Sequence, residues 1–384
     1  MPWRSPPAQP RFREVVALSN TRVVFLQPYV PSYRVPLFDE LSAQLSTEGL
    51  ELVVAHGRPL GAQSRRSDVG IARDWMSEIQ VTHGMVAGAD IRYKHASALM
   101  RSAQVLVSEL ASGDLTTWVQ LMRRPSRVVL WGHGKSYVAA IRPLDAWIEV
   151  QQARRAAHTM TYVESGKAEL VRRGVDAGRV TAVGNSTDTV TLRALADGAR
   201  SRRDDIMGRL GVGAHAALYA GGLDADKRIE FLLSAAERAA ELDADFTLIV
   251  AGDGEEAGKL RVLEGKPWLR WVGTADAAKL AELAIAVECV WMPGRVGLVA
   301  VDSLALQLPL LTTRFKFHAP EIELLAPDTD LFYLPDSPRG FAEAAVELTA
   351  RWRAEGKPES TTPVPTVSDV AAKMVRVLTL VASR

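Results

Sequence analysis

Two cations follow a glycine pair in the segment ALYAGGLDADKRIEFLLSAAERAAEL, residues 217–242. An apolar run ends in Gly221-Gly222, a short loop follows, and a helix is predicted to begin near Lys227-Arg228. Cations in a first turn oppose the helix dipole, which favours anions there by roughly 0.3–1 kcal/mol. A bound phosphate would resolve this conflict, because helix N–H groups, glycine backbone and a lysine would converge on it. The alternative is a solvated cation pair offset by Asp224 and Asp226, and this segment alone leaves both interpretations open.

A carboxylate lies early in a second predicted helix, within CVWMPGRVGLVAVDSLALQLPLLTT, residues 289–313. We expect a strand to end at Met292 and a helix to run from about Leu298 to Gln307, where Pro309 stops it. Asp302 falls about one turn inside this helix, where its carboxylate could accept hydrogen bonds from a diol. Open α/β sheets bind ligands at such carboxyl ends of strands. An ordinary first-turn acid is the structural alternative.

Both segments need buried strands to hold them, and the whole chain has a matching rhythm. Short β-branched runs alternate with longer amphipathic stretches, which indicates parallel strands joined by crossover helices. The runs are 22–26, 50–56, 105–110 and 128–134, followed later by 217–222, 246–252, 269–273 and 287–294. A first helix is expected over 36–45. The sequence therefore predicts an α/β protein with two parallel sheets.

The boundary between the two sheets is predicted to follow a strand at 179–185. The polar helical segment after it ends in glycines that suit a C-cap and a hinge. The predicted divisions are a disordered arm at 1–20, a first domain at 21–190, an interdomain segment at 191–215, a second domain at 216–366 and a final helix at 367–384. Ser368 or Asp369 is the expected N-cap of that helix.

The composition excludes several classes of protein. The 384 residues include one cysteine and no Cys/His cluster with zinc spacing, which fits a reducing cytoplasm. A net charge of +1 argues against a dedicated nucleic-acid binder. That balance conceals an asymmetry, because residues 1–190 carry a net charge of +6 and residues 191–384 a net charge of −5. No apolar run approaches the ~18–20 residues of a membrane span.

Taken in order, the lysine and Asp302 segments resemble the donor-binding half of family-four glycosyltransferases of the GT-B fold. The matching motifs are Gly221-Gly222-Leu223 with Lys227, Gly252-Asp253-Gly254, Gly294 through Asp302, and HAPEIELL at 318–325. In the first half, residues 27–41, 131–136 and 184–189 fall where acceptor-side segments of the family lie. The resemblance covers residues 22–350. It implies two Rossmann-like parallel-sheet domains facing a cleft, with the C-terminal helix crossing back to the first domain.

The resemblance also implies roles for single residues. Lys227 would hold the donor diphosphate, His133 would face the sugar from the first domain, and these two are the expected catalytic residues. Asp302 would bind the ribose hydroxyls, and Glu321 would lie near the sugar or the diphosphate. The other expected donor-binding residues are Gly222, Arg228, Gly252, Gly273, Thr274, Gly294, Gly297 and Leu298, and the acceptor-side residues are Arg34 and Glu109. A structural loop histidine and a surface acid are the alternatives for His133 and Glu109.

Two positions depart from the family pattern. The family's arginine beside the glycine is Gly222 here, so one diphosphate cation is missing, and Arg228 or Arg295 would have to compensate. A charge-assisted contact is worth about 1.5–3 kcal/mol, so this change alone would weaken donor binding. The first glutamate of the family's Glu-x7-Glu pair is Gly294, which resembles a subgroup with Pro-Gly-x-x-Gly-Leu at this position.

The implied activity is retaining, metal-free transfer of a sugar from a nucleoside-diphosphate sugar to an acceptor hydroxyl, in cell-envelope polysaccharide, glycolipid or natural-product biosynthesis. The nucleotide sugar is a co-substrate, no cofactor or nucleic acid is implied, and the acceptor is a glycan, a lipid-linked molecule or a small molecule. Gly222 and Gly294 motivate an alternative, a catalytically silent partner or nucleotide-sugar sensor, and the shared fold motivates a sugar-nucleotide epimerase. The spacing of Gly252, Gly254 and Gly258 fails the dinucleotide fingerprint, which excludes NAD.

The basic first half implies one more partner. Arg65-Arg66, Arg123-Arg124 and Arg154-Arg155 could contact anionic lipid or an anionic acceptor, which would place a cytoplasmic protein at the inner face of the membrane. Solvated surface arginines are the alternative.

Overall fold

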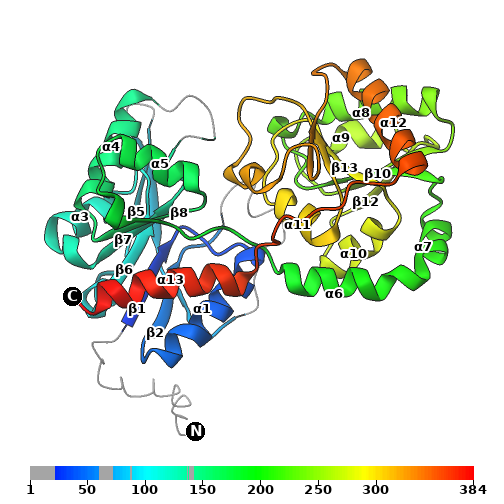
Figure 1. The fold of residues 1–384 in the computed structure, drawn as a ribbon. Helices are drawn as coiled ribbons and strands as arrows, with labels where there is room; N and C mark the ends of the chain where they lie inside the picture. Colours follow the sequence, from blue (N-terminus) through cyan, green and yellow to red (C-terminus); the bar gives the residue numbers. More distant parts are fainter. Residues whose placement is uncertain (1–21, 60–71, 87–88, 136, 138–141) are drawn as a thin grey trace, which may run out of the picture.

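The computed structural model describes residues 22–59, 72–86, 89–135, 137 and 142–384. The predicted arm at 1–20 and the pair Arg65-Arg66 lie outside the described residues. The described chain forms two parallel sheets with helices on both faces of each (Figure 1), as the alternation of apolar runs predicts.

The first sheet has seven parallel strands in the order β3-β2-β1-β6-β7-β8-β9. They are β1 (Arg22–Gln27), β2 (Glu51–His56), β3 (Met76–Glu78), β6 (Ala103–Glu109), β7 (Val128–Gly132), β8 (His158–Thr161) and β9 (Val180–Ala182). In register, Val23 of β1 lies opposite Leu52 of β2 and Val105 of β6. The chain extends the sheet from β1 in one direction and resumes on the other side of β1 with β6. The strand order therefore reverses between β1 and β6, which is where such sheets bind ligands.

The second sheet has six parallel strands in the order β12-β11-β10-β13-β14-β15. They are β10 (His215–Ala220), β11 (Phe246–Ala251), β12 (Leu269–Gly273), β13 (Cys289–Met292), β14 (Leu310–Thr312) and β15 (Leu331–Tyr333). Its order reverses between β10 and β13. These are the strands that lead into the two segments with candidate chemistry.

Alternating side chains of the first sheet pack into separate cores, because successive residues of a strand point to opposite faces. On β7, Val129 and Trp131 pack in the core that contains α1 (Val35–Thr47) and α13 (Val367–Ala382). Val128 and Leu130 pack in the core on the other face, which contains three helices. Those helices are α3 (Leu115–Arg123), α4 (Pro143–Arg155) and α5 (Glu164–Arg172).

Helices cover both faces of the second sheet as well, and its core is one continuous cluster. On one face α8 (Ile229–Leu242) packs against α12 (Pro338–Glu355). On the other face α6 (Thr189–Ala199) packs against α10 (Ala277–Ile285) and α11 (Val299–Leu306) (Figure 1). The remaining helices are α2 (Ser97–Ser102), α7 (Arg203–Leu210) and α9 (Ala257–Arg261).

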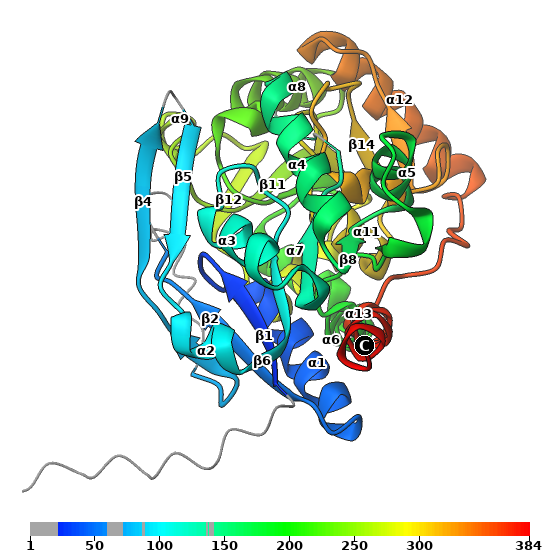
Figure 2. The ribbon, with the colours of Figure 1, turned by 90° about the vertical axis from the view of Figure 1, so that its left-hand side faces the viewer.

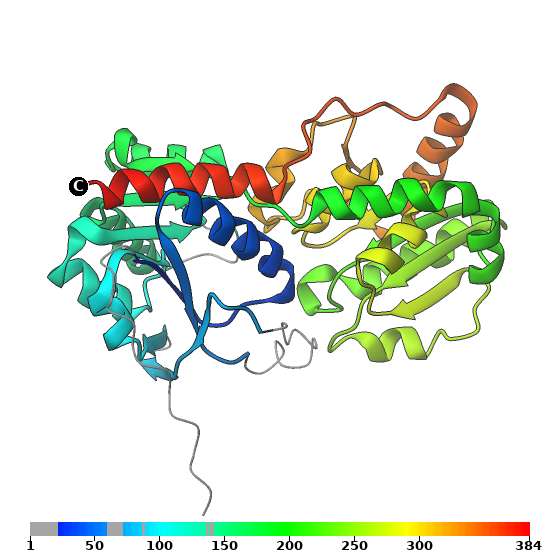
Figure 3. The same cartoon turned by 90° about the horizontal axis from the view of Figure 1, so that it is seen from below.

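The C-terminal helix α13 crosses back to the first sheet, as the resemblance implies. Figures 1 and 3 show it beside α1, and it buries Val370, Met374 and Leu378 in the first core. The side chain of Gln104 donates to the carbonyl of Ala382 at 2.7 Å. The expected N-cap was wrong by two or three residues: the hydroxyl of Thr366 accepts from the amide of Asp369, so Thr366 caps the helix.

Some elements differ from the sequence prediction. The antiparallel hairpin β4 (Val81–Val86) and β5 (Ala89–Lys94) was not predicted. The helical stretch after 190 is two helices, α6 and α7, joined by a 3-10 turn, and the predicted glycine C-cap is Gly211, with φ of 60°. The helix expected at Lys227-Arg228 begins only at Ile229, so both cations precede it.

Candidate functional site

The candidate site lies at the carboxyl ends of β10 and β13, where the order of the second sheet reverses. β10 leads through Gly221 to the 3-10 turn η6 (Ala225–Lys227), and β13 leads through Pro293 to α11. The sequence places its two candidate segments on neighbouring strands, and the structure brings them into contact.

Gly221, Gly252 and Gly273 end neighbouring strands and form a surface without side chains at this edge of the sheet, which we call the ledge. The amide of Gly221 donates to the carbonyl of Ala251, and the amide of Gly252 donates to the carbonyl of Gly273. A Cβ atom on Gly252 would lie 1.9 Å from the carbonyl oxygen of Gly221, so no other residue fits there. Gly222 follows on the ledge, and its carbonyl accepts from the hydroxyl of Tyr219.

Lys227 is fastened to the loop after β13. Its Nζ donates to the carbonyl of Arg295 at 2.6 Å, and the amide of Arg295 donates to the carbonyl of Asp226 at 2.9 Å. A Cβ atom on Gly294 would lie 2.4 Å from the carbonyl carbon of Lys227. The close approach of these two backbones therefore explains the glycine that stands where the family pattern has glutamate.

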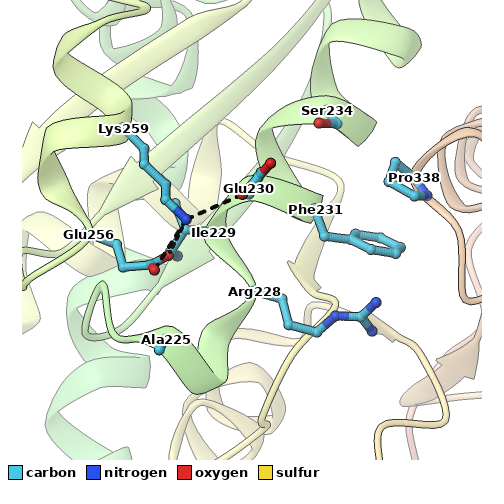
Figure 4. Close-up of a pocket in the computed structure, with 9 residues that line it drawn as sticks. All are labelled: Ala225, Arg228, Ile229, Glu230, Phe231, Ser234, Glu256, Lys259 and Pro338. Carbon is cyan, nitrogen blue, oxygen red and sulfur yellow. Dashed lines mark hydrogen bonds and ion pairs between the residues drawn. The ribbon is translucent and has the colours of Figure 1, made fainter.

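Arg228 lines a hollow of about 410 Å³ beside the start of α8, together with Phe231 (Figure 4). It has a left-handed backbone, with φ of 56°. Its guanidinium pairs with Asp336 at 2.5 Å and lies 4.3 Å from the centre of the Phe231 ring. These contacts hold the guanidinium of Arg228 in the hollow and away from the glycines of the ledge.

Arg295 lies on the side that faces the first domain. Its guanidinium is 3.5 Å from the carboxylate of Asp226, a long ion pair. Its charge also contributes to lowering the pKa of His133, which belongs to the first domain. Of the two arginines considered as substitutes for the missing cation, Arg295 lies toward His133 of the first domain, whereas the side chain of Arg228 lines the hollow beside α8.

A histidine that sequence reasoning did not single out holds the loop after β13 in place. Nδ1 of His318 accepts from the amide of Val296 at 3.2 Å, and Nε2 contacts the carbonyl of Thr313 at 2.9 Å. Burial lowers the pKa of His318, and the charge of Lys227 acts in the same direction. A neutral ring with its proton on Nε2 satisfies both contacts. Its place in the HAPEIELL segment was the only sequence signal for it.

Asp302 is engaged by a residue that joins the two domains. The hydroxyl of Thr187, which follows β9, donates to its carboxylate at 2.7 Å. Burial raises the pKa of Asp302 to about 6, although the hydrogen bond from Thr187 opposes that shift. Leu298 is the N-cap of its helix, and Gly297 stands in open space just before it.

Contacts between the two domains concentrate on the 3-10 turn η7 (Pro320–Leu324). Glu321 is buried, and the side-chain amide of Asn185 donates to it at 2.7 Å. Glu323 accepts from three groups of the first domain, namely Nζ of Lys135, the hydroxyl of Ser165 and the hydroxyl of Tyr137, at 2.8–3.0 Å. The family-implied donor residues Asp302 and Glu321 therefore both lie at the junction of the domains.

On the first domain, His133 follows β7 and packs between aromatic rings. Its ring centre is 4.9 Å from that of Tyr162 and 5.7 Å from that of Tyr137. Burial lowers its pKa to about 4, and the charges of Arg295 and Arg34 contribute to the shift. Nδ1 is buried without a hydrogen-bond partner in the protein. At neutral pH this side chain is therefore an uncharged hydrogen-bonding group.

The two residues predicted on the acceptor side have different surroundings. The guanidinium of Arg34 lies 4.3 Å from the Trp131 ring centre and donates to the hydroxyl of Tyr162, so Arg34 shares the His133 environment. The carboxylate of Glu109 accepts from Nζ of the fully buried Lys94 at 2.9 Å. Lys94 also pairs with the buried Asp114 at 2.7 Å, so Glu109 belongs to an internal charge cluster.

The expected donor-binding residues Gly273 and Thr274 lie at the far side of the ledge, at the end of β12. Gly273 ends β12 with φ of 70°, and Thr274 after it is exposed. Within the described ranges no group of three or more His, Cys, Asp or Glu side chains is placed to hold a metal ion. No helix in that same part of the chain has the length and apolar character needed to cross a membrane.

The arrangement provides a cationic, glycine-lined edge that suits an anion such as a diphosphate. A neutral histidine and aromatic rings lie opposite on the other domain. The cationic edge lies where the strand order of the second sheet reverses, and His133 follows β7, the strand beside the reversal in the first sheet. Ligands of open α/β sheets usually bind at such reversals.

Comparison with known proteins agrees with this description for the second domain. Residues 214–351 match the family model for Glycosyl transferases group 1. A search of curated proteins finds no match.

Solved structures share the fold over nearly the whole chain. UDP-GlcNAc 2-epimerase from Methanocaldococcus jannaschii is 13% identical, with a TM-score of 0.61, over 94% of this chain and 99% of that one. Anabaena Alr3699/HepE in complex with UDP is 13% identical, with a TM-score of 0.58, over 94% and 98%. A glycosyltransferase from Rickettsia africae is 10% identical, with a TM-score of 0.60, over 94% and 96%. The chain has the GT-B arrangement of two Rossmann-like domains.

Proposed function

We propose that the protein transfers a sugar from a nucleoside-diphosphate sugar to an acceptor hydroxyl. The observation that carries the proposal is the placement of Lys227 and Arg295 together at the β10/β13 edge, facing His133 of the other domain. The family model that covers residues 214–351 supports the same reaction class.

In this proposal the leaving diphosphate is stabilised by the cations of the ledge. The bond between the sugar's anomeric carbon and the diphosphate oxygen breaks as the acceptor oxygen attacks from the same face, and the acceptor proton passes to the leaving phosphate. Lys227 and Arg295 balance the charge that develops on the diphosphate. His133, being neutral, donates to or accepts from a sugar hydroxyl and helps to exclude water.

Asp302 and Glu321 would complete the donor site, as the family resemblance implies. The ribose hydroxyls would hydrogen-bond to Asp302, whose second oxygen can accept while Thr187 occupies the first. Glu321 would reach the sugar through a rearrangement of its contact with Asn185. We infer a uridine diphosphate carrier, since the similar Alr3699/HepE is described in complex with UDP and with UDP-glucose.

The direct test is a thermal-shift screen of nucleoside diphosphates, followed by calorimetric titration of those that stabilise the protein. Saturating UDP should raise the melting temperature, and uridine should not. Lys227→Ala should remove most of the shift, whereas Val262→Ser, an exposed change elsewhere in the second domain, should leave it intact. If no nucleoside diphosphate raises the melting temperature, the proposal is wrong.

A sugar-nucleotide epimerase is the second candidate, because structures of UDP-GlcNAc 2-epimerases share the fold. Incubation with UDP-GlcNAc and no acceptor distinguishes the two reactions. Epimerised nucleotide sugar in the product would favour the epimerase. Nucleotide binding without turnover on any glycan, lipid-linked or small-molecule acceptor would favour a sensor or partner subunit, an alternative motivated by Gly222 and Gly294.

A further inference from the structure

The first domain carries an exposed apolar surface on α3 and α4 that the candidate site does not use. Large side chains there are unusually accessible: Leu115 and Met122 of α3 are 44% and 71% exposed, and Leu144 and Trp147 of α4 are 62% and 59% exposed. Figure 2 shows both helices on the side of the first domain that faces away from the second domain. We call this region the α3–α4 surface.

The apolar residues of each helix form one stripe. On α3 the outward residues Leu115, Trp118, Val119 and Met122 follow the i, i+3, i+4, i+7 spacing of one helix face. The inward residues Thr117, Gln120 and Leu121 are buried. The outward stripe is therefore a second apolar face of α3, beyond the one that packs on the sheet.

The stripe of α4 joins that of α3. Leu144, Trp147 and Arg155 lie at the i, i+3 and i+11 positions of one face, and the guanidinium of Arg155 lies 5.8 Å from the centre of the Trp118 ring. This contact between a cation of α4 and a half-buried aromatic ring of α3 brings the two stripes together.

The charges around this surface are strongly one-sided. Residues 115–127 and 142–155 contain six arginines and two acids. All six arginines are exposed, namely Arg123, Arg124, Arg127, Arg142, Arg154 and Arg155. Of the acids, Asp145 pairs with Arg142 at 2.8 Å. Burial raises the pKa of the other, Glu149, to about 7, so this carboxyl is half protonated near neutral pH.

We propose that the α3–α4 surface docks the protein on an anionic lipid surface. Aliphatic side chains and a tryptophan would enter the boundary between headgroups and acyl chains, while the long arginine stems let their charged ends reach lipid phosphates. A protein partner of ordinary composition would meet a surface almost without acids. His133 and α4 belong to the same domain, so docking would hold the proposed acceptor side of the molecule near the membrane.

The full chain should bind vesicles of phosphatidylcholine containing about one third phosphatidylglycerol, and should bind pure phosphatidylcholine vesicles much more weakly. High salt should release it. Leu144→Ser with Trp147→Ser should weaken vesicle binding at least 10-fold. Arg123→Gln, Arg124→Gln and Arg155→Gln together should weaken it on the order of 100-fold, since each cation near an anionic surface contributes about 5-fold.

Matched controls lie on the second domain. Val262→Ser removes an 84% exposed apolar side chain, and Arg351→Gln removes an exposed cation, and neither should change vesicle binding. Unchanged melting temperatures would show that all variants fold. No binding at low salt, equal binding to neutral vesicles, or equal losses in the control variants would each overturn the proposal. So would a shift from dimer to monomer in the Leu144 and Trp147 variant, because it would identify the surface as a contact between copies. A failure of the nucleotide screen leaves this test unaffected.

Discussion

Replacing Arg295 by alanine should weaken the binding of a nucleoside diphosphate by about 10- to 150-fold. A charge-assisted hydrogen bond contributes about 1.5–3 kcal/mol, and each 1.4 kcal/mol is tenfold in affinity. We expect the upper part of that range, because Asp226, 3.5 Å from Arg295, would be left without its partner beside the bound diphosphate. Arg295→Lys should recover part of the loss.

The matched control is Arg228→Ala. Arg228 is the other arginine near Lys227, but its contacts are with Asp336, Thr313 and Phe231 in the separate hollow. This change should lower the melting temperature while altering diphosphate affinity less than twofold. The resemblance gave Arg228 as a donor-binding residue and Arg295 only as a substitute cation, so the pair separates what the structure adds from what the resemblance implies.

The assay is calorimetric titration of the wild-type protein and each variant with UDP and with uridine. The loss in the Arg295 and Lys227 variants should appear with UDP and be absent with uridine, since both cations act on phosphate. A double variant should show coupling, because Nζ of Lys227 donates to the Arg295 carbonyl and the two share one anion. If Arg228→Ala loses affinity and Arg295→Ala keeps it, the assignment of the donor cations is refuted.

Three further outcomes follow from the structure. The folded-state pKa of Asp302 is raised to about 6 from an ordinary value near 4, so its contribution to stability is greatest below pH 4 and is lost as pH rises through about 6. Asp302→Asn should therefore stabilise the protein by about 3 kcal/mol at pH 8 and have little effect at pH 4. Thermal melts at both pH values would measure this difference. Gly294→Ala should destabilise the protein by about 1–3 kcal/mol in urea denaturation, because its Cβ would meet the Lys227 backbone. Gly297→Ala, whose Cβ would have nothing within 4 Å, should be near neutral. Equal effects would contradict the close approach of the Gly294 and Lys227 backbones. Glu323→Ala removes the carboxylate that accepts hydrogen bonds from Lys135, Tyr137 and Ser165. The radius of gyration measured by small-angle X-ray scattering should increase in this variant and stay unchanged in the control Glu347→Ala on α12. Identical scattering curves would show that these contacts do not hold the domains together.

Local pattern predicted much of the scaffold because the strands are continuous apolar runs. The strand at 269–273 was predicted at its observed bounds. Gly294 follows β13 and Asp302 lies in the next helix, as expected, whereas Lys227 lies in a turn after β10 rather than at a helix start. What the pattern missed has little local signature. The strand β8 reads His-Thr-Met-Thr, and only its place between β7 and β9 makes it a buried strand.

The details of the site depended on contacts between distant segments. Nothing near Arg228 in the sequence indicates its left-handed backbone conformation. Helix α8 therefore begins at Ile229, one residue after Arg228, rather than at the predicted position. The contact between Thr187 and Asp302 joins residues of different domains, so no local rule predicts it. At the last helix several residues were competent caps, and differences of about 1 kcal/mol between such residues are too small to choose among them locally.

The return of α13 to the first sheet has a consequence for the order in which the chain can fold during synthesis. Residues 367–382 complete the core around β1 and α1, yet they leave the ribosome after the whole of the second sheet. The second sheet can close while the first still exposes the apolar groove that α13 will cover. Folding of the first half is therefore coupled to synthesis of the second, and a nascent chain stopped between the second sheet and residue 367 would present that groove to chaperones.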